Sequence, residues 1–279
     1  MIEVNGSILK KVYKPRPSDV HKGDYGRLLI VGGNQRYTGA PALAALSAMA
    51  SLRSGVDIVT VIAPKRTADI VAKFSPNLIT VPVEGKFFTS KHVGKVMELA
   101  KKYDAMCIGS GMGLEKETAK FVKKLLETVR IPCVVDADAI KVLKKTELGP
   151  NFVLTPHAYE FYTLTGEKPK ADLTSRIKSV ENVAKKTRAT ILLKGVIDII
   201  SDGRQTAINR THNPYMTVGG TGDTLTGICG SLLAQGNSGF DSACAAAYIN
   251  GKAGNLAAVS RKQGLVATDI IEKIPEVFA

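Results

Sequence analysis

The sequence lacks any long apolar run. No stretch of about 18 consecutive apolar residues, the length needed to cross a membrane, occurs in the 279 residues. The start, Met1-Ile2-Glu3, also lacks the basic-then-apolar pattern of a secretion signal. We therefore expect a cytoplasmic protein that is not embedded in a membrane.

Cysteine is scarce. The four cysteines lie in apolar segments and none has a close neighbour in the chain: Cys107, Cys133, Cys229 and Cys244. This spacing excludes a disulfide framework and argues against a zinc site, which needs clustered ligands. We expect the four thiols to be reduced residues of the core.

Acidic residues are few relative to basic ones. The chain has 25 Asp and Glu but 38 Lys and Arg, which gives a net charge of +13. The basic residues occur as scattered pairs such as Lys101-Lys102 and Lys185-Lys186 and form no single tract, which is typical of solvated helix faces. The excess would help to steer anionic substrates such as nucleotides. No stripe of aromatic and basic residues accompanies it, so we do not expect nucleic-acid binding.

Internal repeats, low-complexity segments and linkers are also missing. Hydrophobic residues make up 44% and charged residues 23% of the chain, as in a globular protein. We expect residues 1–279 to form one domain, with residues 1–26 as a lead-in segment.

Short apolar runs alternate with helix-like segments along the chain, a pattern that predicts a mostly parallel sheet covered by helices on both faces. Strands are expected at residues 27–32, 56–63, 78–81, 105–109, 132–136 and 153–155, and helices at 40–54, 91–102, 117–128, 157–165, 173–188, 221–235 and 240–259. Closely spaced strands at 190–194, 197–201 and 205–208 predict antiparallel additions at one edge. The expected fold class is a three-layer α/β/α sandwich.

Glycines and polar side chains follow the predicted strands. They are Gly32-Gly33-Asn34, the run from Gly109 to Gly113, Asp136, Pro156-His157 and Lys194-Gly195. In parallel α/β sheets, ligands bind beyond the carboxyl ends of the strands. These residues therefore predict a binding site at that edge.

The segment Gly219-Gly220-Thr221-Gly222-Asp223 precedes an apolar, helix-like stretch. Glycines let backbone N–H groups turn toward one anion, and the helix N-terminus adds the positive end of its dipole. A carboxylate beside a phosphate suits a base that acts on a hydroxyl. Asp223 could equally be a helix cap. The segment matches neither the P-loop nor the usual dinucleotide fingerprint.

Two other motifs each allow two interpretations. The three glycines of residues 109–113 could bind a ligand or simply make a tight turn. His157 and Glu160 share a helix face at a spacing of three, so His157 could bind a ligand or cap the helix. Glu160 could act through water on a magnesium ion.

Taken together, these motifs resemble the ADP- or ATP-dependent NAD(P)H-hydrate dehydratases of the ribokinase-like superfamily, over about residues 20–275. Residues 21–26 look like the entry motif of that family, and Tyr37-Thr38-Gly39-Ala40-Pro41 like its substrate loop. Two segments depart from the family pattern. The family has Gly-Pro-Gly-Leu-Gly where this chain has Ser110 and Met112 between the glycines, and it has Ala-Thr in place of Thr217-Val218.

The resemblance implies a role for each matching position. Asp223 would be the catalytic base, assisted by the amides of Gly220 and Gly222. Glu160 would hold magnesium through water. The substrate would contact Ala40, Gly111, Gly113, His157 and Asp223. The adenine nucleotide would contact Lys194, Gly195, Val196, Ile197, Asp198, Asn213, Pro214, Met216, Thr217, Gly219, Gly220, Thr221 and Gly222.

The implied activity is that of a hydro-lyase, which removes water from the S form of hydrated NADH or NADPH while consuming ADP or ATP with Mg²⁺. A homo-oligomer is expected. Two alternatives stay open, namely a small-molecule kinase of the same superfamily, acting on hydroxyethylthiazole, pyridoxal or a sugar, and a nucleotide sensor without turnover.

Overall fold

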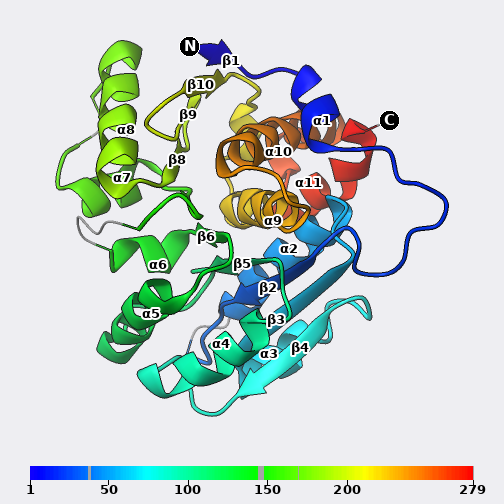
Figure 1. Cartoon of the computed structure of the whole chain (residues 1–279). Coiled ribbons are helices and arrows are strands. Elements are labelled where there is room, and N and C mark those ends of the chain that lie inside the picture. Colours follow the sequence, from blue (N-terminus) through cyan, green and yellow to red (C-terminus); the bar gives the residue numbers. More distant parts are fainter. Residues whose placement is uncertain (37–38, 144–147, 169, 279) are drawn as a thin grey trace.

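A computed structural model describes residues 1–36, 39–143, 148–168 and 170–278 (Figure 1). The strands are β1 (Ile2–Glu3), β2 (Arg27–Val31), β3 (Ile58–Pro64), β4 (Ile79–Val83), β5 (Ala105–Ile108), β6 (Cys133–Val135), β7 (Phe152–Leu154), β8 (Thr190–Leu193), β9 (Asp198–Ser201) and β10 (Thr206–Asn209). The α-helices are α1 (Ser7–Val12), α2 (Ala40–Arg53), α3 (Lys65–Val71), α4 (Val93–Ala100), α5 (Lys116–Thr128), α6 (Ala137–Lys141), α7 (Ala158–Thr165), α8 (Leu173–Thr187), α9 (Thr221–Ala234), α10 (Gly239–Arg261) and α11 (Ala267–Lys273).

The ten strands form one sheet in the order β1-β10-β9-β8-β7-β6-β5-β2-β3-β4. Strand β9 runs antiparallel to both β8 and β10, and every other pair is parallel. This confirms the predicted mostly parallel sheet with antiparallel additions. Because β5 returns to the opposite side of β2 from β3, the order reverses between β2 and β5, and such a switch point is the usual place for a ligand.

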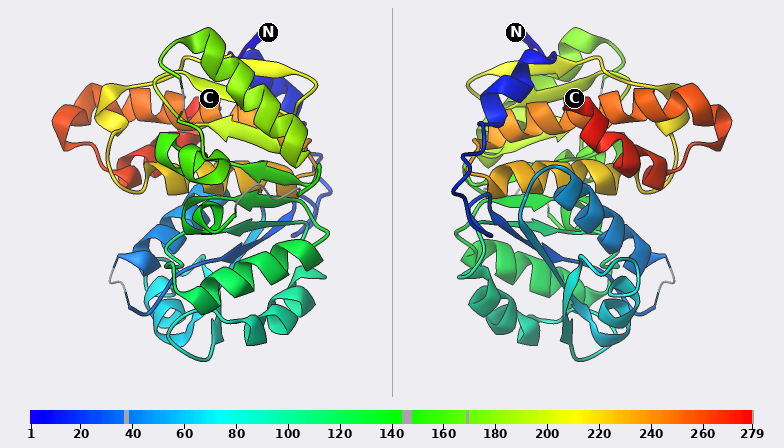
Figure 2. Two further views of the ribbon diagram at one scale, coloured as in Figure 1. Left: turned by 90° about the vertical axis from the view of Figure 1, so that its left-hand side faces the viewer. Right: turned by 90° about the vertical axis from the view of Figure 1, so that its right-hand side faces the viewer.

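Helices cover both faces of the sheet, as the two side views show (Figure 2). Alternate residues of β2 point to opposite faces. Leu28 and Ile30 join the core under α2, α9 and α10, whereas Leu29 and Val31 join the core under α5, α7 and α8. This alternation follows from the two-residue period of a strand. The expected three-layer sandwich is confirmed.

Two regions near the sheet edges differ from the sequence prediction. Strand β4 continues through Pro82 to Val83, although the sequence pattern predicts its end at residue 81. Proline is tolerated there because β4 is an edge strand with an unpaired side. The lead-in segment holds α1 and the short strand β1, in which Ile2 and Glu3 pair with Ala207 and Ile208 of β10.

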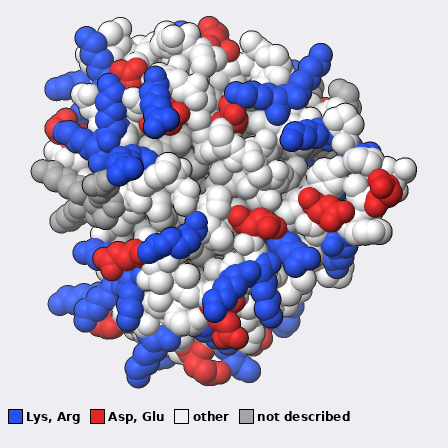
Figure 3. Space-filling view, viewed as in Figure 1, with Lys and Arg blue, Asp and Glu red and all other residues white. Residues whose placement is uncertain are grey.

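Lys and Arg are distributed over the face seen in Figure 3, with Asp and Glu between them. The pairs Lys101-Lys102 and Lys185-Lys186 are exposed, as expected for solvated residues. Within the residues that the structure describes, no helix is both long and apolar enough to span a bilayer.

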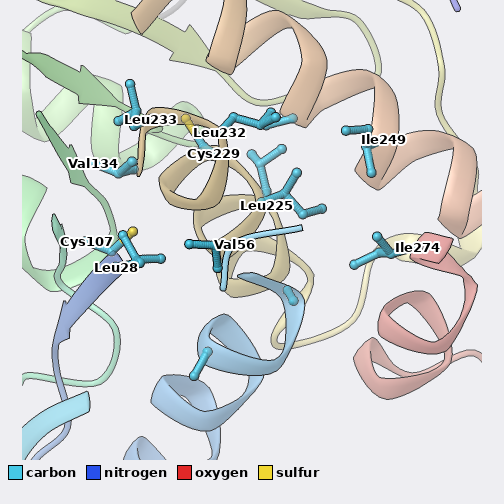
Figure 4. Packing of buried hydrophobic residues seen from close by; sticks show 14 of the residues in the cluster. Leu28, Val56, Cys107, Val134, Leu225, Cys229, Leu232, Leu233, Ile249 and Ile274 are labelled. Atoms are coloured by element: carbon cyan, nitrogen blue, oxygen red, sulfur yellow. The ribbon is translucent and has the colours of Figure 1, made fainter. Parts of the chain in front are cut away.

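Helix α9 packs closely against both α2 and the sheet (Figure 4). A Cβ on Gly227 would lie 2.1 Å from the Ser47 carbonyl oxygen, and one on Gly230 would lie 2.2 Å from the Cys107 Sγ. Only glycine permits such contact. The four cysteines are buried and free, as predicted. The close packing fixes the N-terminal end of α9, where the glycine-rich segment lies.

Candidate active site

The glycine-rich segment forms the N-terminal turn of α9. Gly220 is the N-cap, with φ of 94°, and its Cβ would lie 2.8 Å from the Leu46 Cδ1. This position therefore requires glycine. Gly222 lies inside the first turn and has no left-handed torsion, and its Cβ would meet only the Lys194 Nζ, at 3.3 Å. Helix dipole and lysine charge therefore converge in front of Gly222.

Asp223 occupies the same turn and is 9% exposed. Its Oδ1 atom finds no hydrogen-bond partner among the described residues. No side chain caps α9, so the structure does not favour the helix-cap interpretation. Burial first, and the nearby Asp136 carboxylate second, raise the pKa of Asp223 to about 7. A buried carboxylate with an unused oxygen and this pKa suits a general base at neutral pH.

Asp136 follows β6 and is 2% exposed. Its Oδ1 lies 2.9 Å from the Lys194 Nζ, and its Oδ2 accepts a hydrogen bond of 2.7 Å from the Thr226 hydroxyl of α9. Burial alone would raise the pKa of Asp136, but the Lys194 charge and these hydrogen bonds outweigh it, and the pKa falls below its usual value. Asp136 is therefore ionised, and its charge is fixed beside Asp223.

Lys194 carries the positive charge of the site. Its Nζ also lies 3.9 Å from the Glu160 Oε2. Burial lowers the pKa of Lys194, but Asp136 and Glu160 together outweigh burial and raise it. The ammonium therefore stays charged, and it faces the first turn of α9.

A cleft of about 610 Å³ opens beside this turn. Ten of the predicted site residues line it: His157, Lys194, Gly195, Val196, Asp198, Pro214, Met216, Thr217, Thr221 and Gly222. Val218, which lies within the predicted nucleotide segment 213–222, also lines it. The remaining lining residues were missed by sequence reasoning: Thr211, His212, Leu225, Ala247, Asn250 and Gly251. Nothing in the sequence indicates a binding role for the α10 residues Ala247, Asn250 and Gly251, because an alanine-rich helix is typical of the protein core.

Other predicted nucleotide residues shape the cleft without lining it. Asn213 accepts a hydrogen bond from the Tyr215 amide, and Ile197 packs against the core. Asp198, which does line the cleft, accepts hydrogen bonds from the Gly195 amide and the Asn209 side chain, both of 3.0 Å. These bonds hold the turn between β8 and β9. Burial raises the pKa of Asp198.

His157 is the N-cap of α7. Its Nδ1 accepts hydrogen bonds from the amides of Tyr159 and Glu160, at 3.1 and 3.2 Å. Glu160 completes the capping box, because its Oε2 accepts a hydrogen bond from the His157 amide at 2.9 Å. The structure thus gives His157 the capping role that the sequence left open, and at the same time places it in the wall of the cleft. Its predicted contact with the substrate stays a prediction.

The loops after β2 and β5 meet at the switch point of the sheet. The Asn34 Nδ2 donates a 2.8 Å hydrogen bond to the Met112 carbonyl, and the Gly113 amide donates one of 2.9 Å to the Asp138 Oδ2. Gly111 and Gly113 have positive φ, of 60° and 81°, so the backbone of the turn itself favours glycine at both positions. Their predicted contact with the substrate stays a prediction. Met112 departs from the family pattern and is fully buried.

The expected substrate loop is described only in part. Tyr37 and Thr38 lie outside the described residues. Ala40 is the first residue of α2, at the same edge of the sheet as the loops of the switch point.

The comparisons with known proteins agree with this geometry. A model of the NAD(P)H-hydrate dehydratase family matches residues 28–276, nearly the whole chain. The chain belongs to the NAD(P)H-hydrate dehydratase family.

Within the dehydratase family, the chain is 40% identical over 275 residues to the ADP-dependent (S)-NAD(P)H-hydrate dehydratase of Nitrosopumilus maritimus, covering 97% of this chain and 93% of that protein. It is 38% identical to the protein of the same name from Cenarchaeum symbiosum, covering 97% and 94%. It is also 40% identical to a bifunctional NAD(P)H-hydrate repair enzyme of Pyrobaculum aerophilum, covering 94% of this chain but 52% of that protein. The chain thus spans about half the length of its bifunctional relatives.

Solved structures support the fold of the dehydratase family. A ribokinase-like superfamily protein of Enterococcus faecalis has a TM-score of 0.84 at 25% identity, covering 99% of this chain and 94% of that one. The ADP/ATP-dependent NAD(P)H-hydrate dehydratase of Bacillus subtilis, co-crystallised with ATP and Mg²⁺, has a TM-score of 0.84 at 24% identity, covering 99% and 98%. The predicted ribokinase-like fold is confirmed.

Proposed function

We propose that this chain removes water from the S form of hydrated NADH or NADPH and restores the reduced coenzyme, consuming ADP or ATP. The observation that carries the proposal is the buried Asp223 carboxylate, which keeps an unused oxygen and a pKa of about 7 at the N-terminus of α9. The relatives of matching length, which bear the name ADP-dependent dehydratase, favour ADP as the phosphoryl donor.

The reaction that fits these residues begins as a phosphoryl transfer. Asp223 takes the proton of the ring hydroxyl as the hydroxyl oxygen attacks the terminal phosphorus of the nucleotide. The bond from that phosphorus to the leaving nucleotide breaks, which releases AMP from ADP or ADP from ATP. The amides of Gly219 to Gly222 and the Lys194 ammonium stabilise the charge on the transferring group.

The second stage is an elimination. The ring nitrogen supplies electrons as the carbon–oxygen bond to the new phosphate group breaks, and orthophosphate leaves. A proton is then lost from the neighbouring ring carbon, which restores the double bond. Phosphate is a far better leaving group than hydroxide, and this difference is why the enzyme would consume a nucleotide.

Magnesium would reach the site with the nucleotide phosphates. Among the described residues, no group of three or more His, Cys, Asp or Glu is placed to hold a metal. Both Glu160 oxygens already face His157, with the Oε1 lying 3.3 Å from the His157 Nε2. Mg²⁺ keeps several waters when it binds with substrate phosphates, so contact with Glu160 through water stays a prediction.

The proposed activity is tested by incubating the chain with S-hydrated NADH and either ADP or ATP. Orthophosphate release together with a rise in the absorbance of the reduced nicotinamide is the expected result. A stable phosphorylated product would instead support a kinase, and nucleotide binding without any product would support a sensor. We also propose that residues 1–279 fold as one domain and assemble as a homo-oligomer, which limited proteolysis and light scattering test.

A further inference from the structure

A second cavity, of about 410 Å³, lies at the carboxyl ends of β2, β3 and β4. It is lined by Arg36, Arg66 and Lys86 together with Gln35 and Phe87, and we call it the cation cavity. Gln35 and Arg36 lie in the loop after β2, and Lys86 and Phe87 lie in the loop after β4. Arg66 lies in the first turn of α3, directly after β3. Among the described residues, no Asp or Glu lines the cation cavity, although these two types make up 25 of the 279 residues.

The backbone around the cation cavity is fixed by hydrogen bonds. The Gln35 amide donates a 2.8 Å hydrogen bond to the Lys86 carbonyl, which ties the loop after β2 to the loop after β4. The Arg36 amide donates one of 2.7 Å to the Asn34 Oδ1. Asn34 in turn contacts the loop after β5 through Met112. The cavity is thus joined through two contacts to the switch point of the sheet.

The charges of the cavity are largely uncompensated. The Arg36 guanidinium lies 3.9 Å from the Glu115 carboxylate, at the limit of an ion pair. The structure records no ion pair for Arg66 or Lys86 with any of the described residues. Cations that converge without acidic partners attract phosphate groups, and arginine can bind them with two hydrogen bonds. The half-buried Phe87 offers an aromatic surface beside them.

The position of the cation cavity matches the geometry of the proposed reaction. The nucleotide cleft lies near the ends of β7 and β8, Asp223 lies near Asp136 at the end of β6, and the cavity lies beyond β5 on the other side. Figure 1 shows β2, β3 and β4 following β5 in that direction. From β6 to β3 there are three strand spacings of about 4.8 Å each, or roughly 14 Å. An extended dinucleotide reaches across such a distance.

We propose that the cation cavity binds the phosphate-bearing distal half of the dinucleotide substrate, the half that does not carry the nicotinamide. This inference rests on the proposed function, because it takes the hydrated ring to lie at Asp223. The ligand chemistry is an organic phosphate, either the bridging pyrophosphate or the 2′-phosphate that distinguishes NADPH from NADH. The cavity would therefore contribute to substrate affinity and leave the chemical step to Asp223.

The test compares the double variant Arg66→Ala/Lys86→Ala with a control of equal charge loss, Lys65→Ala/Lys73→Ala. Lys65 and Lys73 are exposed residues on and next to α3, and neither lines the cation cavity. The substrates are hydrated NADH, hydrated NADPH and the hydrated form of reduced nicotinamide mononucleotide, which lacks the distal half. Binding of the product NADPH is measured separately by calorimetry.

We expect the Arg66→Ala/Lys86→Ala variant to raise KM for the dinucleotides, and to weaken NADPH binding, by at least about tenfold, the usual effect of losing charge-assisted contacts. Its kinetics with the mononucleotide and its KM for ADP should match those of the control. A larger loss for NADPH than for NADH would indicate the 2′-phosphate, and equal losses the pyrophosphate.

Two results would overturn the inference. One is an NADPH affinity that is the same in the double variant and in its control, and the other is an equal loss with mononucleotide and dinucleotide. Failure of the proposed function gives a different result. In that case the unmodified chain turns over none of the three hydrated substrates, and the calorimetric comparison still decides whether the cation cavity binds the dinucleotide.

Discussion

The Lys194 Nζ lies 2.9 Å from the Asp136 Oδ1, and this contact joins the end of β8 to the end of β6 across β7. The pair places one positive and one negative charge beside Asp223. The negative charge raises the pKa of Asp223 after burial has already done so, whereas the positive charge opposes the rise. Burial therefore has the largest effect on the pH range in which Asp223 can accept a proton, and the pair adjusts that range.

Replacing Asp136 should move that range. In Asp136→Asn the like charge is gone, so the pKa of Asp223 should fall and the rising limb of the pH–rate profile should shift from about 7 to lower pH. Breaking a buried ion pair should also cost about 3–5 kcal/mol of stability. The profile of kcat/KM, which reports the pKa of the free enzyme, is measured from about pH 5 to 9, roughly two pH units on each side of the pKa.

Asp138→Asn is the matched control for that profile. Asp138 is paired with Lys141 at 2.9 Å, and it is not among the groups that shift the pKa of Asp223. Its profile should keep the limb near 7. If Asp136→Asn and Asp138→Asn gave identical profiles, Asp136 would not control the base.

Two glycines of the same turn should respond differently to alanine. Gly220→Ala forces a side chain into φ of 94° and against Leu46 and Ala267, so it should destabilise the fold by about 1–3 kcal/mol. Gly222→Ala meets only the Lys194 Nζ, so stability should hold while nucleotide turnover falls. A glycine-rich turn suggests a backbone conformation that alanine cannot adopt, but Gly222 does not have one. The added methyl group should therefore affect only the approach of the phosphate. The stability of both variants is measured by denaturant unfolding, and their turnover by steady-state kinetics. Normal kinetics in Gly222→Ala would contradict a phosphate site at this turn.

Sequence patterns are sufficient to predict the layers of the fold and to indicate the edge of the sheet at which the cleft lies. The alternation of apolar runs and helices predicted the sheet, and residues following strands, such as Lys194 and Gly113, lie where parallel strand ends meet. The buried pairing of Asp136 with Lys194 could not be predicted, because it joins residues 58 apart in the chain and depends on strand order. The α10 residues that line the nucleotide cleft, Ala247, Asn250 and Gly251, could not be predicted either. The sequence of an alanine-rich helix does not show which of its faces contacts a ligand.

His157 both caps α7 and lines the nucleotide cleft, and two variants can separate these roles. His157→Ala removes the acceptor for two amides of α7 and should cost about 1 kcal/mol of stability. His157→Asn retains a good N-cap and should recover most of that loss, while it still removes the imidazole from the cleft. If the imidazole contacts the hydrated ring, both variants should raise KM for hydrated NADH by about tenfold, or ~1.4 kcal/mol. Normal KM values in His157→Asn would restrict His157 to capping.

The raised pKa of Asp223 also predicts a dependence of stability on pH. Because the folded state holds this proton up to about pH 7 and the unfolded state releases it near the usual value of 3.8, the group loses its stabilising effect as pH rises between these values. A difference of one between the pKa values of the two states corresponds to about 1.4 kcal/mol. The amide side chain of the Asp223→Asn variant does not titrate, so the variant lacks this pH-dependent loss. The free energy of unfolding of the variant minus that of the unmodified chain should therefore rise from about pH 4 to 7 and stay constant above about 7. A difference that does not vary with pH would contradict the raised pKa.

The most direct test of the central claim is the turnover of Asp223→Asn with S-hydrated NADH and ADP, measured beside its affinity for ADP. The near-isosteric amide keeps the packing of α9 but cannot accept the hydroxyl proton. We predict that turnover falls by roughly 10²–10⁴, the usual contribution of a positioned general base, while ADP binding and the fold are retained. Turnover within about threefold of the unmodified chain, with ADP bound equally well, would show that Asp223 is not the base.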